Sequence, residues 1–237
     1  MKICLIGYGK MGKAIEAIAL QKGYEISYRI TSENSTLLRE ALRHSDVAIE
    51  FTKPDLAVDH IKLCFESNKP IICGTTGWYG QLEDIKSACK LQSGSLVYAS
   101  NFSIGVNIFF ALNRYLANLM KSHPEYRISL KEAHHTEKLD APSGTAFSLA
   151  NDILKFNSNY TEWTKSSSID PTQIAIESIR EKNVVGTHWV NYKSSIDELE
   201  IKHEAFSREG FAAGSLLAAS WILNNKGIYT MNDVLGL

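Results

Sequence analysis

Short apolar runs alternate with amphipathic segments over the first hundred residues of the chain. Residues 10–22, 55–68 and 81–91 carry apolar side chains at intervals of three and four, the period of a helix with one buried face. The strand-like runs between them lie at 3–6, 26–30, 47–51, 70–73 and 96–99. Strands that alternate with helices pair in parallel through crossover connections, and their apolar, β-branched content is typical of a sheet covered on both faces. This half of the chain predicts an α/β, doubly wound parallel sheet.

The pattern changes after residue 101. A strand with one buried and one wet face is predicted at 126–133, because Tyr126, Ile128 and Leu130 alternate there with polar side chains. Further strands are predicted at 174–180, 184–192 and 198–206, helices at 107–120, 143–156 and 211–224, and a surface loop over the Ser-, Asn- and Thr-rich residues 157–172. Consecutive strands with short links favour an antiparallel or mixed sheet, hence an α+β second domain.

Composition narrows the class of protein. A hydrophobic content of 44% and a charged content of 22% are ordinary for a globular domain, and the net charge of −1 argues against a nucleic-acid binder. No apolar run approaches the roughly 20 residues that span a bilayer, and the first ten residues are too soon interrupted by Gly and Lys to form a secretory signal. We therefore expect a cytoplasmic protein with no membrane partner.

The cysteines show no metal-binding or disulfide pattern. Cys4, Cys64, Cys73 and Cys89 form no Cys-x-x-Cys pair and no Cys/His ligand spacing. We predict buried structural thiols and no metal site.

A glycine-rich turn follows the first predicted strand and opens the first predicted helix. Its residues are Gly7, Tyr8, Gly9, Lys10, Met11 and Gly12, a G-x-G-x-x-G sequence. The first glycine permits a tight turn, the second lets the backbone approach a pyrophosphate, and the third lets helix and strand pack closely. In this context the motif predicts a Rossmann-type dinucleotide site. No acid directly follows the second strand, where Thr31, Ser32 and Glu33 stand, so the choice between NADPH and NADH stays open.

Two more polar turns follow predicted strands at the sheet edge where doubly wound folds bind ligands. Their backbone amides and hydroxyls are candidates to hold the nicotinamide, and the alternative is that they are simple turns and helix caps. The candidates are Gly74, Thr75 and Thr76 after the fourth strand and Ala99, Ser100, Asn101 and Phe102 after the fifth.

Residues 132–146 concentrate groups suited to chemistry where a strand ends and a helix begins. His134 and His135 offer imidazoles for proton transfer near neutral pH, and Lys138 can donate a proton or bind an anion. The helix that follows opens with Ser143, Gly144 and Thr145, whose N–H and hydroxyl groups suit a carboxylate. We interpret the stretch as the catalytic site for a small anionic substrate.

The motifs GYGKMG, GTTG, SNFSIGVN, EAHH..K.DAPSGTA and GIYTMNDVLGL stand in this order along the chain. In this order they resemble the 4-hydroxy-tetrahydrodipicolinate (dihydrodipicolinate) reductases of lysine and diaminopimelate synthesis. The resemblance implies NAD(P)H-dependent reduction of the dicarboxylate 4-hydroxy-tetrahydrodipicolinate to tetrahydrodipicolinate. It implies catalytic roles for His134 and Lys138. It also implies substrate contacts from His135, Gly144 and Thr145. The glycine-rich turn and the two polar turns would bind the cofactor. A basic pair often found in this family is replaced by Thr136 and Glu137.

The resemblance also implies an organisation for the chain. The dinucleotide-binding domain would comprise residues 1–101 and 208–237, and the substrate-binding and oligomerisation domain residues 102–207, assembled as a homotetramer. Two other functions stay open. One is another Rossmann-fold reductase of an imine or keto acid, which the histidine–lysine loop disfavours. The other is a non-catalytic nicotinamide-sensing module, which would have no need of a crowded proton-donor loop.

Overall fold

In the computed structural model, residues 1–165, 170–207 and 209–237 are described, and they form two compact units. Unit 1 comprises Met1–Ile104 and Glu209–Leu237, and unit 2 comprises Gly105–Arg208. The boundaries predicted from sequence, after residues 101 and 207, lie close to these divisions.

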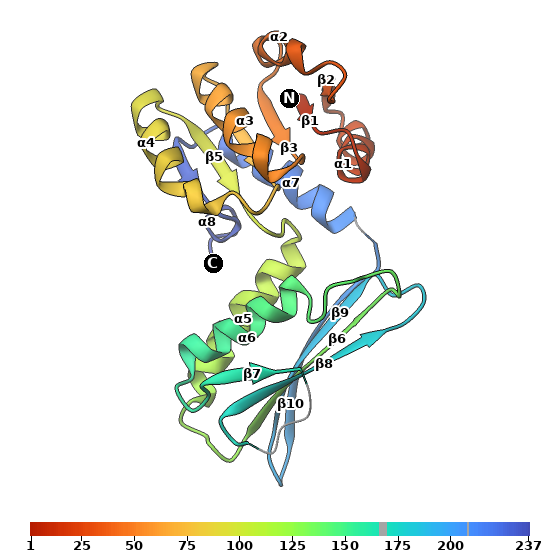
Figure 1. Cartoon of the computed structure of the whole chain (residues 1–237), viewed down its shortest axis with the longest axis vertical. Helices are drawn as coiled ribbons and strands as arrows, with labels where there is room; N and C mark the ends of the chain where they lie inside the picture. Colours follow the sequence, from red (N-terminus) through yellow and green to blue (C-terminus); the bar gives the residue numbers. More distant parts are fainter. Residues whose placement is uncertain (166–169, 208) are drawn as a thin grey trace. The chain divides into compact units, whose positions relative to one another are not determined.

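Unit 1 is built on a parallel sheet (Figure 1). Within the described residues its strands run in the order β11-β5-β4-β3-β1-β2. They are β1 (Lys2–Ile6), β2 (Glu25–Ile30), β3 (Val47–Glu50), β4 (Ile71–Cys73), β5 (Ser95–Tyr98) and β11 (Gly227–Tyr229). The chain proceeds from β1 to β2 on one side and to β3 on the other, so the direction of winding reverses between β1 and β3. Ligands bind beside the carboxyl ends of the strands at such a reversal.

Helices cover both faces of this sheet because side chains alternate along each strand. Cys4 and Ile6 of β1 pack with the helices of one face, and Ile3 and Leu5 pack with those of the other. The first face carries α2 (Leu38–Arg43), α3 (Pro54–Glu66) and α4 (Leu82–Gln92); the second carries α1 (Lys10–Gln21), α7 (Glu209–Ile222) and α8 (Met231–Leu235). Short 3₁₀ turns, η1 (Ser35–Leu37) and η2 (Tyr79–Gln81), precede α2 and α4.

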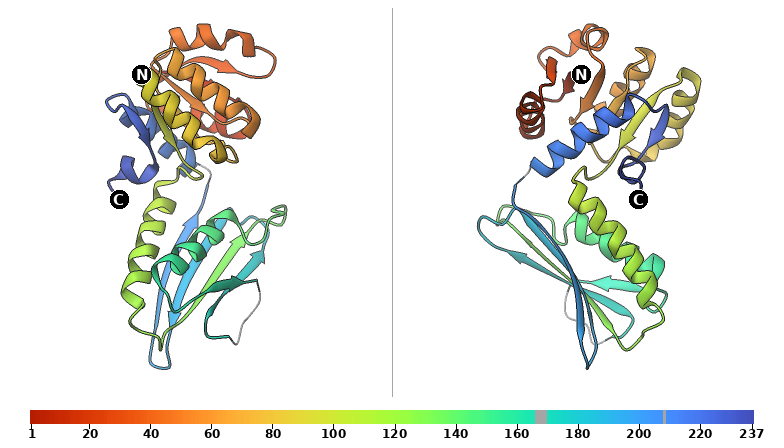
Figure 2. Two further views of the ribbon diagram at one scale, coloured as in Figure 1. Left: turned by 60° about the vertical axis from the view of Figure 1, so that its left-hand side comes forward. Right: turned by 180° about the vertical axis from the view of Figure 1, so that it is seen from behind.

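Unit 2 is a mixed sheet with two helices on one of its faces (Figure 2). The described strands run in the order β10-β9-β6-β8-β7, with β6 parallel to β8 and antiparallel to β9. They are β6 (Arg127–His134), β7 (Glu162–Thr164), β8 (Gln173–Arg180), β9 (Gly186–Lys193) and β10 (Glu198–Ala205). Helices α5 (Ile104–Met120) and α6 (Gly144–Phe156) pack on the apolar face, which includes Ile128, Leu130 and Val190.

The predicted fold class is confirmed, and the five strands predicted in the first hundred residues all form. The loop predicted over residues 157–172 is wrong in part, because Glu162–Thr164 pairs with β8 as an edge strand, Trp163 lying opposite Ile174. Residues 166–169 of that segment lie outside the described residues. The strand β11, of three residues, and the helix α8, of five, were also not predicted, because segments this short show no clear hydrophobic period. All four cysteines are buried, as predicted.

In the part of the chain that the structure describes, no helix combines the length and the apolar character needed to cross a membrane.

Candidate active site

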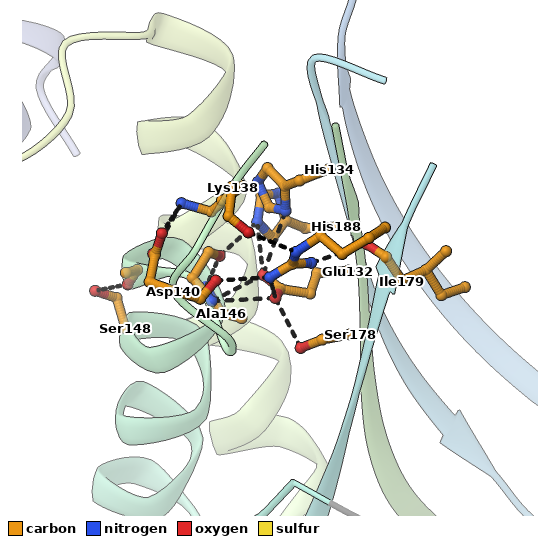
Figure 3. A network of polar contacts seen from close by, with 12 residues as sticks. Glu132, His134, Lys138, Asp140, Ala146, Ser148, Ser178, Ile179 and His188 are labelled. Carbon is orange, nitrogen blue, oxygen red and sulfur yellow. Dashed lines mark hydrogen bonds and ion pairs between the residues drawn. The ribbon is translucent and has the colours of Figure 1, made fainter. Parts of the chain in front are cut away.

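Strand pairing in unit 2 gathers polar side chains beneath the loop that follows β6. The alternation that buries Ile128 and Leu130 places Glu132 and His134 on the same face of β6. The register sets Glu132 opposite Ser178 of β8 and opposite His188 of β9, and it sets His134 opposite Arg180. Residues far apart in sequence thereby converge at the end of one strand (Figure 3).

Glu132 is the centre of this cluster. Its carboxylate is fully buried and accepts hydrogen bonds from the backbone N–H of Ser143, at 3.1 and 3.0 Å, and from the hydroxyl of Ser178, at 2.8 Å. The Arg180 guanidinium lies 3.4 Å away. Burial raises the pKa of Glu132, but the hydrogen bonds from Ser143 and Ser178 and the nearby His134 outweigh it and leave the pKa below its ordinary value. The carboxylate is therefore ionised at neutral pH.

Two histidine rings flank this carboxylate. Nδ1 of His134 lies 3.6 Å and Nε2 of His188 lies 3.8 Å from Glu132 Oε2, and the ring centroids are 5.0 Å apart. Burial lowers the pKa of His188 to about 3. Burial also lowers the pKa of His134, aided by the Lys138 and Arg180 charges and opposed by Glu132. Both imidazoles are therefore predominantly neutral at neutral pH.

Glu132 and the two histidines also have the donor types of a metal site. Glu132, His134 and His188 present ligand atoms within 4.8 Å of one another. However, His188 Nε2 already shares a hydrogen bond with Ser143 Oγ at 3.1 Å, and the Arg180 guanidinium contacts the carboxylate that a cation would need. The donor set fits a hydrogen-bonded network better than a metal centre.

Arg180 holds the loop that carries Lys138. Its Nε donates to the carbonyl of Lys138 at 3.3 Å and its Nη2 to the carbonyl of Asp140 at 2.6 Å. The Lys138 ammonium donates to both oxygens of Asp140, at 2.7 and 2.8 Å, and this bond lowers the pKa of Asp140. The lysine side chain is 22% exposed, so its ammonium lies near the surface of the loop, where Asp140 binds it and Arg180 holds the backbone.

The N-terminus of α6 adjoins this loop. Ser143 is the N-cap residue and accepts a hydrogen bond from the N–H of Ala146 at 3.2 Å. A Cβ placed on Gly144 would meet no described atom within 4 Å, so space lies open beside the first turn. Thr145 is half-buried in that turn and His135 is half-buried in the preceding loop. Unpaired N–H groups and the positive end of the helix dipole suit a carboxylate here.

The glycine turn in unit 1 fits a dinucleotide. Gly7 has a φ of +95°, and a Cβ there would lie 2.2 Å from the carbonyl oxygen of Phe51. A Cβ on Gly12 would lie 2.4 Å from the carbonyl oxygen of Gly7, whereas one on Gly9 would meet no described atom within 4 Å. Gly7 and Gly12 are thus required for packing, whereas Gly9 leaves open space at the start of α1. No side chain of the described residues caps that helix, which leaves its N–H groups available to a phosphate.

The other predicted cofactor residues divide into supporting and surface groups. Thr75 and Phe102 are buried, and Thr75 uses both its hydroxyl and its carbonyl within the protein. Thr76 and Ser100 are exposed, and Gly74, Ala99 and Asn101 are half-buried. Tyr8 turns its hydroxyl to Glu16, while Lys10 and Met11 lie in the first turn of α1. We therefore expect Thr75 and Phe102 to support the turns rather than to touch a cofactor with their side chains.

Sequence reasoning missed part of the cluster. It named His134, His135, Lys138 and the start of α6, but not Ser178, Arg180 and His188, and it gave Glu132 no role. The period of two along β6 was the available signal for Glu132, since a carboxylate on an otherwise apolar face must be partnered.

Comparison with known proteins places this geometry in a family. The family model described as Dihydrodipicolinate reductase, N-terminus, matches residues 1–102, and the one described as Dihydrodipicolinate reductase, C-terminus, matches residues 105–235. A 4-hydroxy-tetrahydrodipicolinate reductase of Christiangramia forsetii is 44% identical over 237 residues, covering 99% of this chain and 98% of the relative. A reductase of the same name from Neisseria meningitidis serogroup C is 35% identical, covering 94% of this chain and 84% of the relative.

Solved structures share the fold. A dipicolinate-bound dihydrodipicolinate reductase from Paenisporosarcina sp. TG-14 matches with a TM-score of 0.78 at 20% identity, covering 97% of each chain. An amine dehydrogenase from Mycobacterium smegmatis matches with a TM-score of 0.62 at 10% identity, covering 98% of this chain and 95% of that one. The fold alone thus extends beyond the reductases, whereas the family models cover both units. This chain belongs to the dihydrodipicolinate reductase family.

Proposed function

We propose that this protein reduces 4-hydroxy-tetrahydrodipicolinate to tetrahydrodipicolinate with NADPH or NADH, in lysine and diaminopimelate synthesis. The observation that carries the proposal is the Glu132-centred network, which holds His134, the Lys138 loop and the N-terminus of α6 together. Family membership over both units and the glycine turn in unit 1 support the same reaction. When bound, the reduced nicotinamide supplies the hydride.

The start of α6 provides the substrate's anchoring site. The substrate is a dicarboxylate, and the relative from Paenisporosarcina binds dipicolinate, another dicarboxylate. We assign one carboxylate to the N–H groups of Gly144 and Thr145 with the Thr145 hydroxyl, and a further contact to His135. Glu132 fixes this site indirectly, since it accepts the N–H of Ser143, the residue that caps the helix.

Lys138 is the immediate proton donor in this proposal. The reaction takes up one hydride at a ring carbon and one proton, and the 4-hydroxyl leaves as water. Burial keeps His134 predominantly neutral, so its imidazole is a poor acid, whereas Lys138 is a partly exposed ammonium at the loop. His134 then orients the reacting groups by hydrogen bonding. Asp140 holds the ammonium in place before substrate arrives.

The first prediction tests the activity and these two roles. The purified protein should consume NADPH or NADH absorbance when mixed with freshly made product of dihydrodipicolinate synthase. Lys138→Ala and His134→Ala should each lower kcat by about 10²–10⁴-fold, the usual contribution of general acid–base groups, with cofactor affinity nearly unchanged. Absence of turnover in the unmodified protein would refute the function, and near-normal turnover in both variants would refute the assignment.

The second prediction concerns Glu132→Gln. The amide keeps the size of the side chain but offers one acceptor oxygen where the carboxylate offers two, so a donor from Ser143 or Ser178 is left unpaired. We expect KM for the substrate to rise about tenfold, the equivalent of one such bond, with cofactor affinity unchanged. The pKa of His134, followed by NMR, should fall further, because the Glu132 charge is the largest of the influences that raise it.

The matched control is Glu177→Gln. Glu177 lies next to Ser178 on β8 but on the opposite face, 65% exposed and 3.9 Å from Lys131. It should alter neither KM nor the pKa of His134. If Glu132→Gln behaves like this control, the carboxylate does not organise the site.

The third prediction concerns cofactor choice. Arg29, the penultimate residue of β2, lies at the edge where a 2′-phosphate would be read, but its guanidinium is bonded to Glu16 and lies 5.8 Å from the Tyr8 ring centroid. With that charge neutralised, we expect both cofactors to be used with at most a tenfold preference, about 1.4 kcal/mol. Glu16→Gln should free Arg29 and shift the ratio of kcat/KM values toward NADPH by several-fold.

Glu25→Gln, at the opposite end of β2 and paired with Lys2 at 3.7 Å, is the control and should leave the ratio unchanged. A preference of about a hundredfold in the unmodified protein, some 2.8 kcal/mol, would contradict the balance of charges described here.

The fourth prediction concerns assembly. We propose a homotetramer built through unit 2, because the face of its sheet opposite α5 and α6 carries Trp189 between the ammonium groups of Lys131 and Lys202, at 5.6 and 5.4 Å from the ring centroid. This face and the edge strand β10 offer surfaces for pairing between subunits. Light scattering at micromolar concentration should give about four times the 26.4 kDa subunit mass. A monomeric mass would exclude this assembly.

A further inference from the structure

A second buried carboxylate belongs to unit 1, whereas the groups assigned to proton transfer belong to unit 2. Glu50 is the last residue of β3 and is fully buried. Among the described residues the basic side chain paired with it is His60, whose Nδ1 lies 3.6 Å away; no lysine or arginine of the described chain contacts it. A carboxylate in this setting is costly for stability unless hydrogen bonds compensate, and apolar residues usually serve packing better.

The hydrogen bonds to Glu50 come from the last residue of β4 and from the turns that follow β3 and β4. Its Oε1 accepts the backbone N–H of Thr52 at 2.9 Å, the hydroxyl of Thr52, and the hydroxyl of Thr75 at 3.1 Å. Its Oε2 accepts the thiol of Cys73 at 3.0 Å. Thr75 Oγ1 also accepts the N–H of Thr52, at 2.8 Å, which closes a small ring of hydrogen bonds between the two turns.

These bonds keep the carboxylate charged. Burial raises the pKa of Glu50, but the nearby His60 and the hydrogen bonds from Thr52, Cys73 and Thr75 outweigh it and leave the pKa below its ordinary value. An ionised carboxylate is an acceptor at both oxygens, which matches a set of partners that can all donate.

The turn after β3 lies beside the point where the sheet reverses its winding, between β1 and β3, and the turn after β4 is its neighbour on the other side. Strand β3 lies between β1 and β4, and the residue after Glu50, Phe51, supports the turns on both sides. A Cβ on Gly7 would clash with the Phe51 carbonyl at 2.2 Å, and a Cβ on Gly74 would clash with the Phe51 ring at 2.0 Å. The segment 50–52 therefore packs against both the glycine turn and the turn after β4 and supports them.

We propose that Glu50 is a positioning residue for the dinucleotide. Its ionised carboxylate fixes Thr52 and Thr75, and through them the exposed groups of the turn after β4, including Thr76, that would meet the cofactor. The side chain itself touches no cofactor, because it is fully buried beneath these turns. The inference uses only the dinucleotide-binding part of the proposed function and is independent of which substrate is reduced.

The test is cofactor binding in the absence of substrate, measured on the full chain by NADPH and NADH fluorescence. Glu50→Gln presents one acceptor oxygen in place of two, and we expect Kd for both cofactors to rise about tenfold at a temperature where the variant is fully folded. Glu66→Gln is the matched control, since Glu66 is exposed on α3 and pairs with Arg39 at 2.9 Å. It should leave Kd within about twofold, as expected for a surface ion pair.

A second pair of variants separates positioning from folding. Thr75→Val removes the hydroxyl at nearly constant volume and should weaken cofactor binding, whereas Thr75→Ser keeps the hydroxyl and should restore it. In the double variant with Glu50→Gln, the effects of Thr75→Val should be less than additive, because both changes break one network. If Glu50→Gln fails to fold, the Val and Ser pair still decides the question.

Unchanged Kd in folded Glu50→Gln, or equal Kd in the Val and Ser variants, would overturn the inference while leaving the proposed function intact. Failure of the unmodified protein to bind either cofactor would overturn both. Equal kcat at saturating cofactor with a raised Kd would support positioning of the dinucleotide rather than a role in the reaction itself.

Discussion

A carboxylate withdrawn from water must be met by hydrogen-bond donors, and this constraint shapes the proposed substrate site. Glu132 satisfies it with a backbone N–H from the start of α6 and with a hydroxyl and a guanidinium from strand β8, and His188 of β9 lies alongside. Each donor is thereby fixed relative to the others. The helix N-terminus, the histidines and the loop of Lys138 owe their arrangement to one fully buried charge.

The Glu132 charge also helps to set the protonation states of the neighbouring ionisable groups. Burial would leave His134 and His188 neutral in any apolar site, and Glu132 opposes this only partly, because Lys138 and Arg180 act against it. In the proposed reaction the neutral imidazoles bind and orient the substrate, and the partly exposed ammonium of Lys138 donates the proton. Arg180 contributes twice, since it balances the Glu132 charge and holds the carbonyls of Lys138 and Asp140.

Much of this architecture can be predicted from the sequence, for local reasons. The glycine turn requires glycine at position 7, where φ is positive, and at position 12, where a Cβ would meet a carbonyl. The motif can therefore be recognised without a structure. The period of two along residues 126–134 already places Glu132 on the buried face. What could not be predicted is which partners reach it. Ser178 and His188 are ordinary residues on strands whose register is set by the whole sheet. The edge strand β7 was missed for a related reason: its polar surroundings indicate a loop, and only pairing with β8 makes it a strand.

The two buried carboxylates solve a similar problem with different compensation. Glu132 has an arginine against it, so removing its charge leaves Arg180 facing neutral groups and still bound to loop carbonyls. Glu50 has no such cation among the described residues and relies on hydroxyl, thiol and amide donors, with His60 at 3.6 Å. Hydrogen bonds to a carboxylate are directional, whereas an ion pair tolerates wider geometry. The hydrogen bonds that compensate for the burial of Glu50 therefore define the shape of two turns more strictly than an ion pair with a lysine could. A site that must present backbone groups to a dinucleotide gains from that strictness, even where an apolar core residue would give a more stable sheet.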